Sequence, residues 1–476
     1  MDTEIQDTQK QEQPSQDKAQ RQVDEYANAK LSPLLLKFAI PAIIGMLCGG
    51  VQNIICRIFV GQACGPEALA AVQIGFPITT VFMALAMMIG MGSMTLISIR
   101  LGQQRRDDAD KLLGQATFLL FLIPLICTLA TLPFLDPVLR FIGSSDAVLP
   151  YAHDYFQIML FSMVFFAMSV GLNNIIRAQG APKIAMGTQI LAAVLTIGLN
   201  WLFVWVLPWG VRGSALGMLL GNFFSLFWIF GYFMRKVSYL KIRMKYLRIF
   251  PHTLRAILPL GLTPFLVQGA NAIQQFIMNI SLVTYGGDSA MTALSITMAI
   301  SSIVLLPFLG FSQGATPIMG YNYGAKNFDR IKGTLLRAMG YGTAFAALGV
   351  VCIFIWAPQM VHLFITGNPE VEALSVHALK LFFSCLVFIP VGVCSGALFQ
   401  ATGKVVRSMF LALSRQFIFF IPLLLILPHW FGLDGCWLAA PASDVAAFII
   451  SIIVVYMGLK SIKREMETIG VGKLVA

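Results

Sequence analysis

The sequence predicts an all-α membrane protein with twelve transmembrane helices in two six-helix parallel repeats. Hydrophobic residues make up 57% of the 476 residues and charged residues only 12%, so the charges suffice for loops and tails but not for a sizeable water-soluble domain. Apolar stretches of about 20 to 29 residues recur, each long enough to cross a bilayer core. The 41 Gly and 22 Pro residues are typical of kinked, closely packed membrane helices.

The order of polar and apolar segments predicts the domain organisation. Residues 1–30 are polar, Gln-rich and without the apolar core of a signal peptide, which predicts a disordered cytoplasmic tail. The amino-terminal six-helix lobe is expected at 31–234, a basic cytoplasmic inter-lobe loop at 235–255, the carboxyl-terminal six-helix lobe at 256–460 and a second cytoplasmic tail at 461–476. The predicted spans are 34–60, 69–98, 112–134, 150–176, 184–207, 213–234, 256–284, 291–319, 334–357, 373–399, 405–427 and 433–459.

The distribution of basic residues predicts the orientation. If both termini are cytoplasmic, only Arg57, Arg140, Arg212 and Lys380 of the 33 Lys and Arg residues lie on the outer side. This asymmetry explains the net charge of +11 without a nucleic-acid partner. The basic, aromatic segment 239–250 fits a positive-inside anchor, which we favour, or a site for anionic lipid.

An internal repeat relates the two halves. A shift of 222 residues aligns Gly92 with Gly314 and Gly210 with Gly432, with a one-residue slip where Gly180 meets Gly403. Because each repeat has an even number of spans, both halves share one orientation and are related by an axis along the membrane normal. Two such bundles around a central cavity are typical of an alternating-access carrier.

Several classes of function lack their sequence signatures. The chain has no GxxxxGK[ST] nucleotide-binding loop and no His-Glu-x-x-His motif, which disfavours direct use of ATP and intramembrane catalysis. The eight cysteines lie mostly in apolar runs and are expected to be free thiols. The five histidines lack metal-ligand spacing, so no cofactor is expected.

Five segments, in order, carry a family resemblance. They are FAIPAIIGML, RIFVGQACGPEALAAVQIGFP, NNIIRAQGAPKIAM, QGATPIMGYNYGA and SRQFIFFIPLLLILPHWFGLDGCWLAAPASD. Over residues 31–460 the chain resembles the multidrug and toxic compound extrusion (MATE) family, in particular its bacterial MepA-like branch. The resemblance implies secondary active export of bulky, lipophilic, often cationic compounds in exchange for protons or sodium ions.

The chain departs from the family pattern at two acidic positions. Family members commonly carry Asp before Arg-Ile-Phe in the first span, where this chain has Cys56. They also commonly carry Asn and Asp, four residues apart, in the fifth span, where this chain has Thr196 and Asn200. A thiol or an amide does not replace a titrating carboxylate simply, so ion coupling through the amino-terminal half is in question.

Asp444 is the only carboxylate expected at clear membrane depth. An ionised Asp there is costly, so it should be protonated, paired or facing water. Arg415 lies next to Gln416 in the eleventh predicted span, and the sequence does not determine whether it pairs with Asp444. Asp444 is therefore either the ion-coupling residue, with a sodium site possible there, or a structural hydrogen-bonding group near the Pro441 kink.

Other polar residues in the spans either satisfy one another or line a substrate cavity. In the amino-terminal half these candidates are Asn53, Cys56, Asn173, Asn174, Thr196 and Asn200. In the seventh span, Gln268, Asn271, Gln275 and Asn279 fall on one helical face, for which we favour cavity lining.

The sequence thus predicts a secondary active multidrug efflux transporter in a bacterial plasma (inner) membrane, multi-pass, with both termini cytoplasmic. It would exchange small, amphipathic, often cationic organic compounds for H+ or Na+ by alternating access, with the lipid bilayer as its surroundings and no oligomer required. The alternatives are a flippase of related fold for lipid-linked precursors and, less favoured, an intramembrane enzyme.

Overall fold

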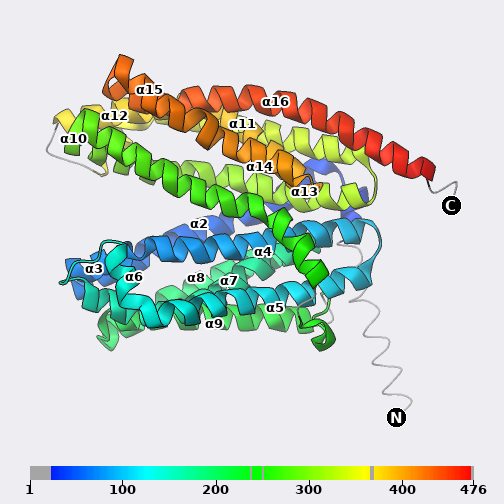
Figure 1. Ribbon diagram of the computed structural model, residues 1–476, viewed down its shortest axis with the longest axis horizontal. Helices are drawn as coiled ribbons and strands as arrows, with labels where there is room; N and C mark the ends of the chain where they lie inside the picture. Colours follow the sequence, from blue (N-terminus) through cyan, green and yellow to red (C-terminus); the bar gives the residue numbers. More distant parts are fainter. Residues whose placement is uncertain (1–22, 236–237, 249–250, 365–368, 473–476) are drawn as a thin grey trace, which may run out of the picture. The chain divides into compact units, whose positions relative to one another are not determined.

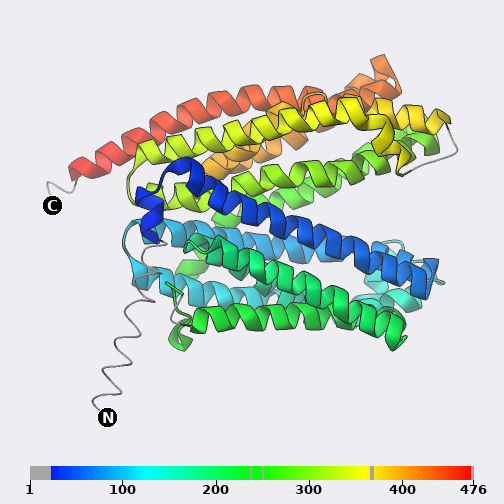
Figure 2. The same ribbon diagram turned by 180° about the vertical axis from the view of Figure 1, so that it is seen from behind.

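The computed structural model describes residues 23–235, 238–248, 251–364 and 369–472, and its ribbon is shown in Figure 1 and, from behind, in Figure 2. These residues form helices and connecting turns, and no strand occurs among them. Twelve helical segments are long and apolar enough to cross a membrane, which confirms the predicted number of spans. The observed segments reach beyond the predicted apolar limits; the first, for example, runs from Leu31 to Cys64.

The first half of the chain forms short and long helices between glycine- and proline-containing turns. They are α2 (Leu31–Cys64), α3 (Pro66–Ile74), α4 (Phe76–Gly102), α5 (Arg106–Thr131), η1 (Leu132–Phe134), α6 (Leu135–Phe141), α7 (Leu149–Ala178), α8 (Pro182–Trp201), η2 (Leu202–Val206) and α9 (Gly210–Met234). Proline occupies the first turn of α3, α4, α7 and α8, where its missing N–H costs no helical hydrogen bond. These prolines therefore fix where helices begin.

The second half repeats this arrangement. Its elements are η3 (Met244–Tyr246), α10 (Pro251–Gly324), α11 (Phe328–His362), α12 (Pro369–Phe383), η4 (Leu386–Phe388), α13 (Ile389–Ala401), α14 (Val405–Leu413), η5 (Ser414–Phe420), α15 (Ile421–Phe431) and α16 (Leu433–Gly472). The long α10 contains two spans, Pro251–Gly287 and Ser289–Gly324, separated by the non-helical backbone of Gly287.

Left-handed backbone positions recur at the repeat distance found in the sequence. Gly65 and Gly287 have φ of 87° and 59°, and Gly210 and Gly432 have φ of 61° and 57°. The non-glycine pair Gln104 and Lys326 shares a φ of 60°. Positive φ is uncommon for residues other than glycine, so its recurrence at matched turns indicates that both halves use the same local geometry.

The described residues form two compact units. Their limits differ from the predicted lobe limits at the start of α2 and at the start of α10. The first unit contains 23–30 and 44–265, and the second contains 31–43 and 266–472. Residues 31–43, expected in the amino-terminal lobe, therefore cluster with the second unit. Residues 256–265, expected in the carboxyl-terminal lobe, cluster with the first.

Glycines explain why these helix ends pack where they do. In the first unit, a Cβ on Gly92 would lie 2.4 Å from the carbonyl oxygen of Ile257, and one on Gly261 would lie 1.7 Å from the carbonyl oxygen of Met88. In the second unit, a Cβ on Gly314 would lie 2.8 Å from the backbone nitrogen of Ala39. Only glycine permits such close approach of backbones, a common feature of membrane helix packing.

Each unit has its own apolar core. In the first unit, a cluster around Phe82, Phe156 and Leu160 packs α3, α4 and α7 together. In the second unit, Trp437 and Leu424 belong to one cluster and Phe308 to another. Helix packing rather than long-range backbone pairing therefore holds each unit together.

The segments expected as tails are partly ordered. Of the tail predicted at 1–30, residues 1–22 lie outside the described part, but 23–28 are helical rather than disordered. Tyr26 is fully buried, and its hydroxyl donates a hydrogen bond to the carbonyl oxygen of Arg177 at 2.7 Å. At the other end, α16 continues past 460 to Gly472, and Glu465 Oε2 lies 2.6 Å from Nζ of Lys404. Both segments are held in place by contacts with residues far away in the sequence, which the local composition does not predict.

The predicted inter-lobe loop packs on the first unit through two buried side chains. Gln179 Oε1 accepts hydrogen bonds from Ser238 Oγ and the backbone N–H of Leu240, both at 3.1 Å. Asp110 Oδ1 accepts one from the backbone N–H of Lys241 at 3.0 Å. This segment thus has specific polar contacts in addition to its basic charge.

Candidate functional site

An ion pair inside the second unit joins α16 to η5. Asp444 lies about a third of the way along the span Leu433–Thr468, and only 2% of its side chain is exposed. Its Oδ1 lies 2.7 Å from Nε of Arg415, whose side chain is 34% exposed. Of the alternatives left open by the sequence, this structure contains the paired one. The pair gives the buried carboxylate a charged hydrogen-bond donor, which a buried charge requires.

Arg415 lies on a stretch of π-helix, where the backbone turn is wider than in an α-helix. Such segments occur often at functional sites because they alter the direction of side chains within a helix. Arg415 and Gln416 are consecutive, yet both reach polar partners: Gln416 Nε2 donates to Oδ1 of Asn271 at 2.5 Å. Two consecutive residues of η5 therefore bond to two different helices, Arg415 to α16 and Gln416 to α10.

The four amide residues predicted on one face of α10 differ in their hydrogen bonds and in their exposure. Gln275 Nε2 donates to Oδ1 of Asn279 at 2.9 Å, one turn away on the same helix. Asn271 is exposed, whereas Gln268, Gln275 and Asn279 are half-buried. Of these four amides, Asn271 is the one with a hydrogen bond to η5 among the described residues, through Gln416.

Two of the predicted amides in the first unit, Asn173 and Asn174, form hydrogen bonds. The first bonds to a neighbouring helix and the second bonds within its own helix. Asn173 Oδ1 accepts a hydrogen bond from Thr188 Oγ1 at 2.5 Å, which links α7 to α8. Asn174 Oδ1 lies 3.5 Å from Nη1 of Arg177 on the next turn. Both asparagines are buried, so this geometry favours helix packing over open cavity lining for them.

Thr196 and Asn200 form a second polar group, against α9. Both are fully buried, and Thr196 Oγ1 and Asn200 Oδ1 have no hydrogen-bond partner within the described part of the chain. Asn200 Nδ2 makes a long contact of 3.4 Å with the carbonyl oxygen of Ser214. The close approach of α9 depends on glycine, because a Cβ at Gly221 would lie 2.1 Å from Thr196 Oγ1. The π-helical segment η2 follows directly after Trp201.

The remaining two candidates, on α2, show no hydrogen bond to this group among the described residues. Asn53 is exposed, and its Nδ2 reaches the carbonyl oxygen of Gly49, one turn away on its own helix, at 3.4 Å. Cys56 is buried, with 5% of its surface exposed. The sequence candidates of the first unit therefore lie in separate environments rather than in one polar cluster.

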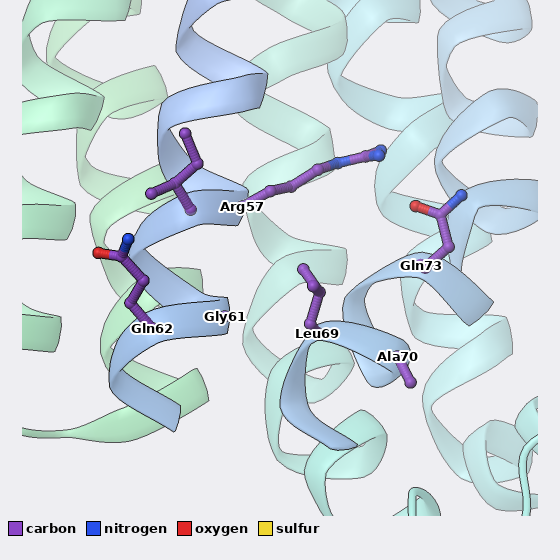
Figure 3. A pocket seen from close by; sticks show the side chains of 7 residues that line it. Arg57, Gly61, Gln62, Leu69, Ala70 and Gln73 are labelled. Atoms are coloured by element: carbon purple, nitrogen blue, oxygen red, sulfur yellow. The ribbon is translucent and has the colours of Figure 1, made fainter. Parts of the chain in front are cut away.

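A cavity of about 640 Å³ lies in the first unit beside these α2 residues. It lies between the end of α2 and α3, and Figure 3 shows its lining side chains. The lining consists of Arg57, Ile58, Gly61, Gln62, Leu69, Ala70 and Gln73. The sequence signal for it was Arg57, one of few basic residues outside the predicted inner loops, but sequence alone did not indicate that α3 would fold back beside it.

Metal-ligating side chains do not gather in the part of the chain that the structure describes. No group of three His, Cys, Asp or Glu residues there is arranged to hold a metal ion. The polar features of the described residues include the Arg415 and Asp444 pair, the amides and Arg57 at the cavity. These groups are suited to binding and to changes of charge pairing.

Comparisons with known proteins agree with this architecture. The MatE family model matches residues 41–202 and 264–426. The multidrug export protein MepA of Staphylococcus haemolyticus (strain JCSC1435) is 26% identical over 430 residues, which cover 90% of this chain and 94% of that protein. One similar solved structure is the outward-facing conformation of a multidrug resistance MATE family transporter of the MOP superfamily, with a TM-score of 0.87, 26% identity and coverage of 92% and 98% of the two chains.

A second similar structure is a MOP superfamily transporter from Pyrococcus furiosus Vc1 (DSM3638), described by the reverse polarity of its binding pocket. Its TM-score is 0.87 at 25% identity, over 92% of this chain and 98% of that one. The similarity to these transporters confirms the family predicted from the motifs. Because the family model matches more than half of the chain, this protein belongs to the MatE family and is a multi-pass membrane transporter, not an enzyme.

Proposed function

We propose that this MatE transporter exports small, amphipathic, often cationic organic compounds across a bacterial plasma (inner) membrane, in exchange for protons or sodium ions, by alternating access. Both termini are cytoplasmic in this proposal, and one chain suffices for transport. Support comes from relatives named multidrug export protein and from a solved neighbour described as a multidrug resistance transporter.

The observation that carries the ion-coupling part is the contact between Arg415 and Asp444. A carboxylate with 2% of its side chain exposed, 2.7 Å from a guanidinium, has two states of clearly different energy: paired and unpaired. Proton binding would neutralise Asp444 and remove its attraction to Arg415. A sodium ion would instead compete with the guanidinium for the carboxylate oxygens.

Either event would weaken the contact between η5 and α16 and favour a different arrangement of these elements. A ligand shifts a conformational equilibrium only by its different affinity for the two states. A cationic substrate would compete with the coupling ion for the Asp444 carboxylate, so that each binds only when the other has left, which is the minimum requirement for exchange. Asp444 is thus the proposed ion-coupling residue, with Arg415 as its charged partner.

The test is uphill dye efflux from proteoliposomes in which a proton gradient, a sodium gradient or neither is imposed. Wild-type protein is expected to move the dye under one gradient only. Asp444→Asn, which keeps the shape but loses the charge, should lose gradient-driven efflux while still binding the dye. The matched control is Asp434→Asn on the same helix, because Asp434 is 51% exposed and pairs with His377.

Two results would contradict the proposal. If dye efflux by the wild-type protein were the same with and without each gradient, the protein would not exchange its substrate for protons or sodium ions. Full gradient-driven efflux by Asp444→Asn, at normal expression and thermal stability, would assign Asp444 a structural role only.

A flippase for lipid-linked precursors has less support. Such cargo carries several negative charges, and we expect its cavity to be strongly cationic. The cavity in the first unit includes one basic residue, Arg57, among its seven lining residues.

A further inference from the structure

The cavity in the first unit joins one cationic group to an apolar surface. Arg57 is half-buried on α2, and its lining partners Ile58, Leu69 and Ala70 are apolar. In Figure 3 the Arg57 side chain extends from α2 towards the side of α3 that carries Gln73. The cavity has a volume of about 640 Å³, it is open rather than enclosed, and nearly all of its lining surface is apolar.

The lining provides no negative charge to neutralise Arg57. Its other polar members, Gln62 and Gln73, are neutral amides, and no carboxylate is among the lining residues. Two other arginines predicted on the outer side differ in this respect. Arg140 lies 2.8 Å from Asp146, and Arg212 lies 2.8 Å from Asp154. Arg57 therefore gives the cavity a positive potential that a ligand can complement.

The shape of the cavity depends on a close contact between α2 and α3. A Cβ at Gly61 would lie 3.3 Å from Cδ2 of Leu69, so glycine leaves room for this side chain to form part of the apolar wall. The guanidinium of Arg57 can bind a carboxylate or sulfonate through two parallel hydrogen bonds. The amides supply further hydrogen-bonding groups of either polarity.

We propose that this cavity binds the anionic group of an amphipathic compound that the protein exports, with Arg57 as the residue that selects for it. The ligand class is an apolar, drug-sized body with a carboxylate or sulfonate, including zwitterions that also carry a cationic group. The inference rests on the proposed export function and narrows its substrate class. It distinguishes this cavity from the Arg415 and Asp444 pair, which supplies ion coupling in the other unit.

The experiment compares two dyes that differ in one group: tetramethylrhodamine, which has a free carboxylate, and its methyl ester. Dissociation constants are measured by fluorescence anisotropy on the full-length purified protein in detergent. The wild-type protein should prefer the acid over the ester. Arg57→Gln should reduce this preference about tenfold, the size of effect expected when one charge-assisted contact is lost.

Three controls isolate the charge of Arg57. Arg140→Gln removes a positive charge outside the cavity and should leave the preference unchanged. Arg57→Lys keeps the charge without the planar fork and should retain part of the preference. Elution volume and thermal stability of each variant show whether it is folded.

An equal preference in wild-type and Arg57→Gln protein, or an equal change in Arg140→Gln, would overturn the assignment. Phosphatidylglycerol is added as a competitor, because a lipid headgroup also carries an anion beside an apolar body. If it displaced the acid dye from wild-type but not from Arg57→Gln protein at equal concentration, the cavity would be a lipid site and the substrate assignment would fail. Gradient-driven efflux of the methyl ester is measured separately, so loss of export itself is distinguishable from loss of anion selection.

Discussion

Asp444 and Arg415 form an ion pair whose members are unequally buried. The atoms Oδ1 and Nε are 2.7 Å apart, with 2% of the Asp444 side chain and 34% of the Arg415 side chain exposed. Removing one partner from a buried pair leaves the other charge without compensation. The unequal burial therefore makes the consequence depend on which partner is removed.

We expect Arg415→Gln to destabilise the protein more than Asp444→Asn. The first change leaves a buried carboxylate without its cationic partner, at a cost of about 3 kcal/mol. The second leaves a guanidinium that is already one-third exposed and replaces a charged contact by a neutral one, at about 1 kcal/mol. Thermal unfolding in detergent measures the difference. Equal destabilisation by the two variants would contradict the expected difference between the two partners. The double variant, with both Arg415→Gln and Asp444→Asn, should be more stable than Arg415→Gln alone.

Substitutions in the first unit should affect substrate range rather than ion coupling. Cys56 and Asn200 stand where the resemblance to the MATE family predicts acids, and neither group readily exchanges a proton near neutral pH. Cys56→Ala and Asn200→Ala are expected to reduce efflux of some dyes several-fold while the response to an imposed gradient persists. Efflux of a panel of dyes with and without the gradient measures this. Loss of gradient dependence for every dye in either variant would return the coupling role to this unit.

Two glycines on α10 should respond differently to the same substitution. A Cβ at Gly261 would lie 1.7 Å from the carbonyl oxygen of Met88, so Gly261→Ala should separate α10 from α4 and destabilise the protein by about 1–3 kcal/mol. A Cβ at Gly269 would meet no atom of the described residues within 4 Å, and Gly269→Ala should be neutral or stabilise by up to about 1 kcal/mol. Thermal unfolding of both variants tests the pair, and equal effects would exclude close helix packing at Gly261.

The basic loops should be inaccessible from outside the cell. Single cysteines placed at 100–111 and 235–255 in a cysteine-free variant are expected to react with an impermeant maleimide only after the membrane is opened. A cysteine restored at Cys64, near the end of α2, should react in intact cells. Labelling of the basic loops in intact cells would reverse the proposed orientation, which depends on the positive-inside rule.

Much of the architecture could be predicted from particular sequence features. Apolar runs such as 291–319 locate spans because hydrocarbon excludes charged residues, although the span itself extends over Ser289–Gly324. The apolar run ends before the helix does, since helix ends outside the hydrocarbon tolerate polar residues. The glycine spacing that relates Gly210 to Gly432 predicted matched turns, and both residues have left-handed backbone.

The candidate site could be predicted only in part. Asp444 was recognisable because a carboxylate within a long apolar run is costly and needs a physical explanation. Its partner was not determined, because the direction of Arg415 depends on the π-helical turn of η5, and no local residue pattern specified that turn. Likewise, Asn173 and Asn200 had the same expected role, but one bonds to Thr188 and the other has a buried oxygen without a partner among the described residues.

The sequence by itself determined the span number, the repeat and the family, because these depend on hydropathy, periodic glycines and motifs along one chain. Only the tertiary structure decided that residues 31–43 cluster with the second unit, that Tyr26 is buried against the first and that α3 lines an open cavity together with Arg57. The physical reason is the range of the interactions. Burial in a membrane acts on each segment separately, whereas close packing at glycines and pairing of buried polar groups depend on residues far apart in the sequence.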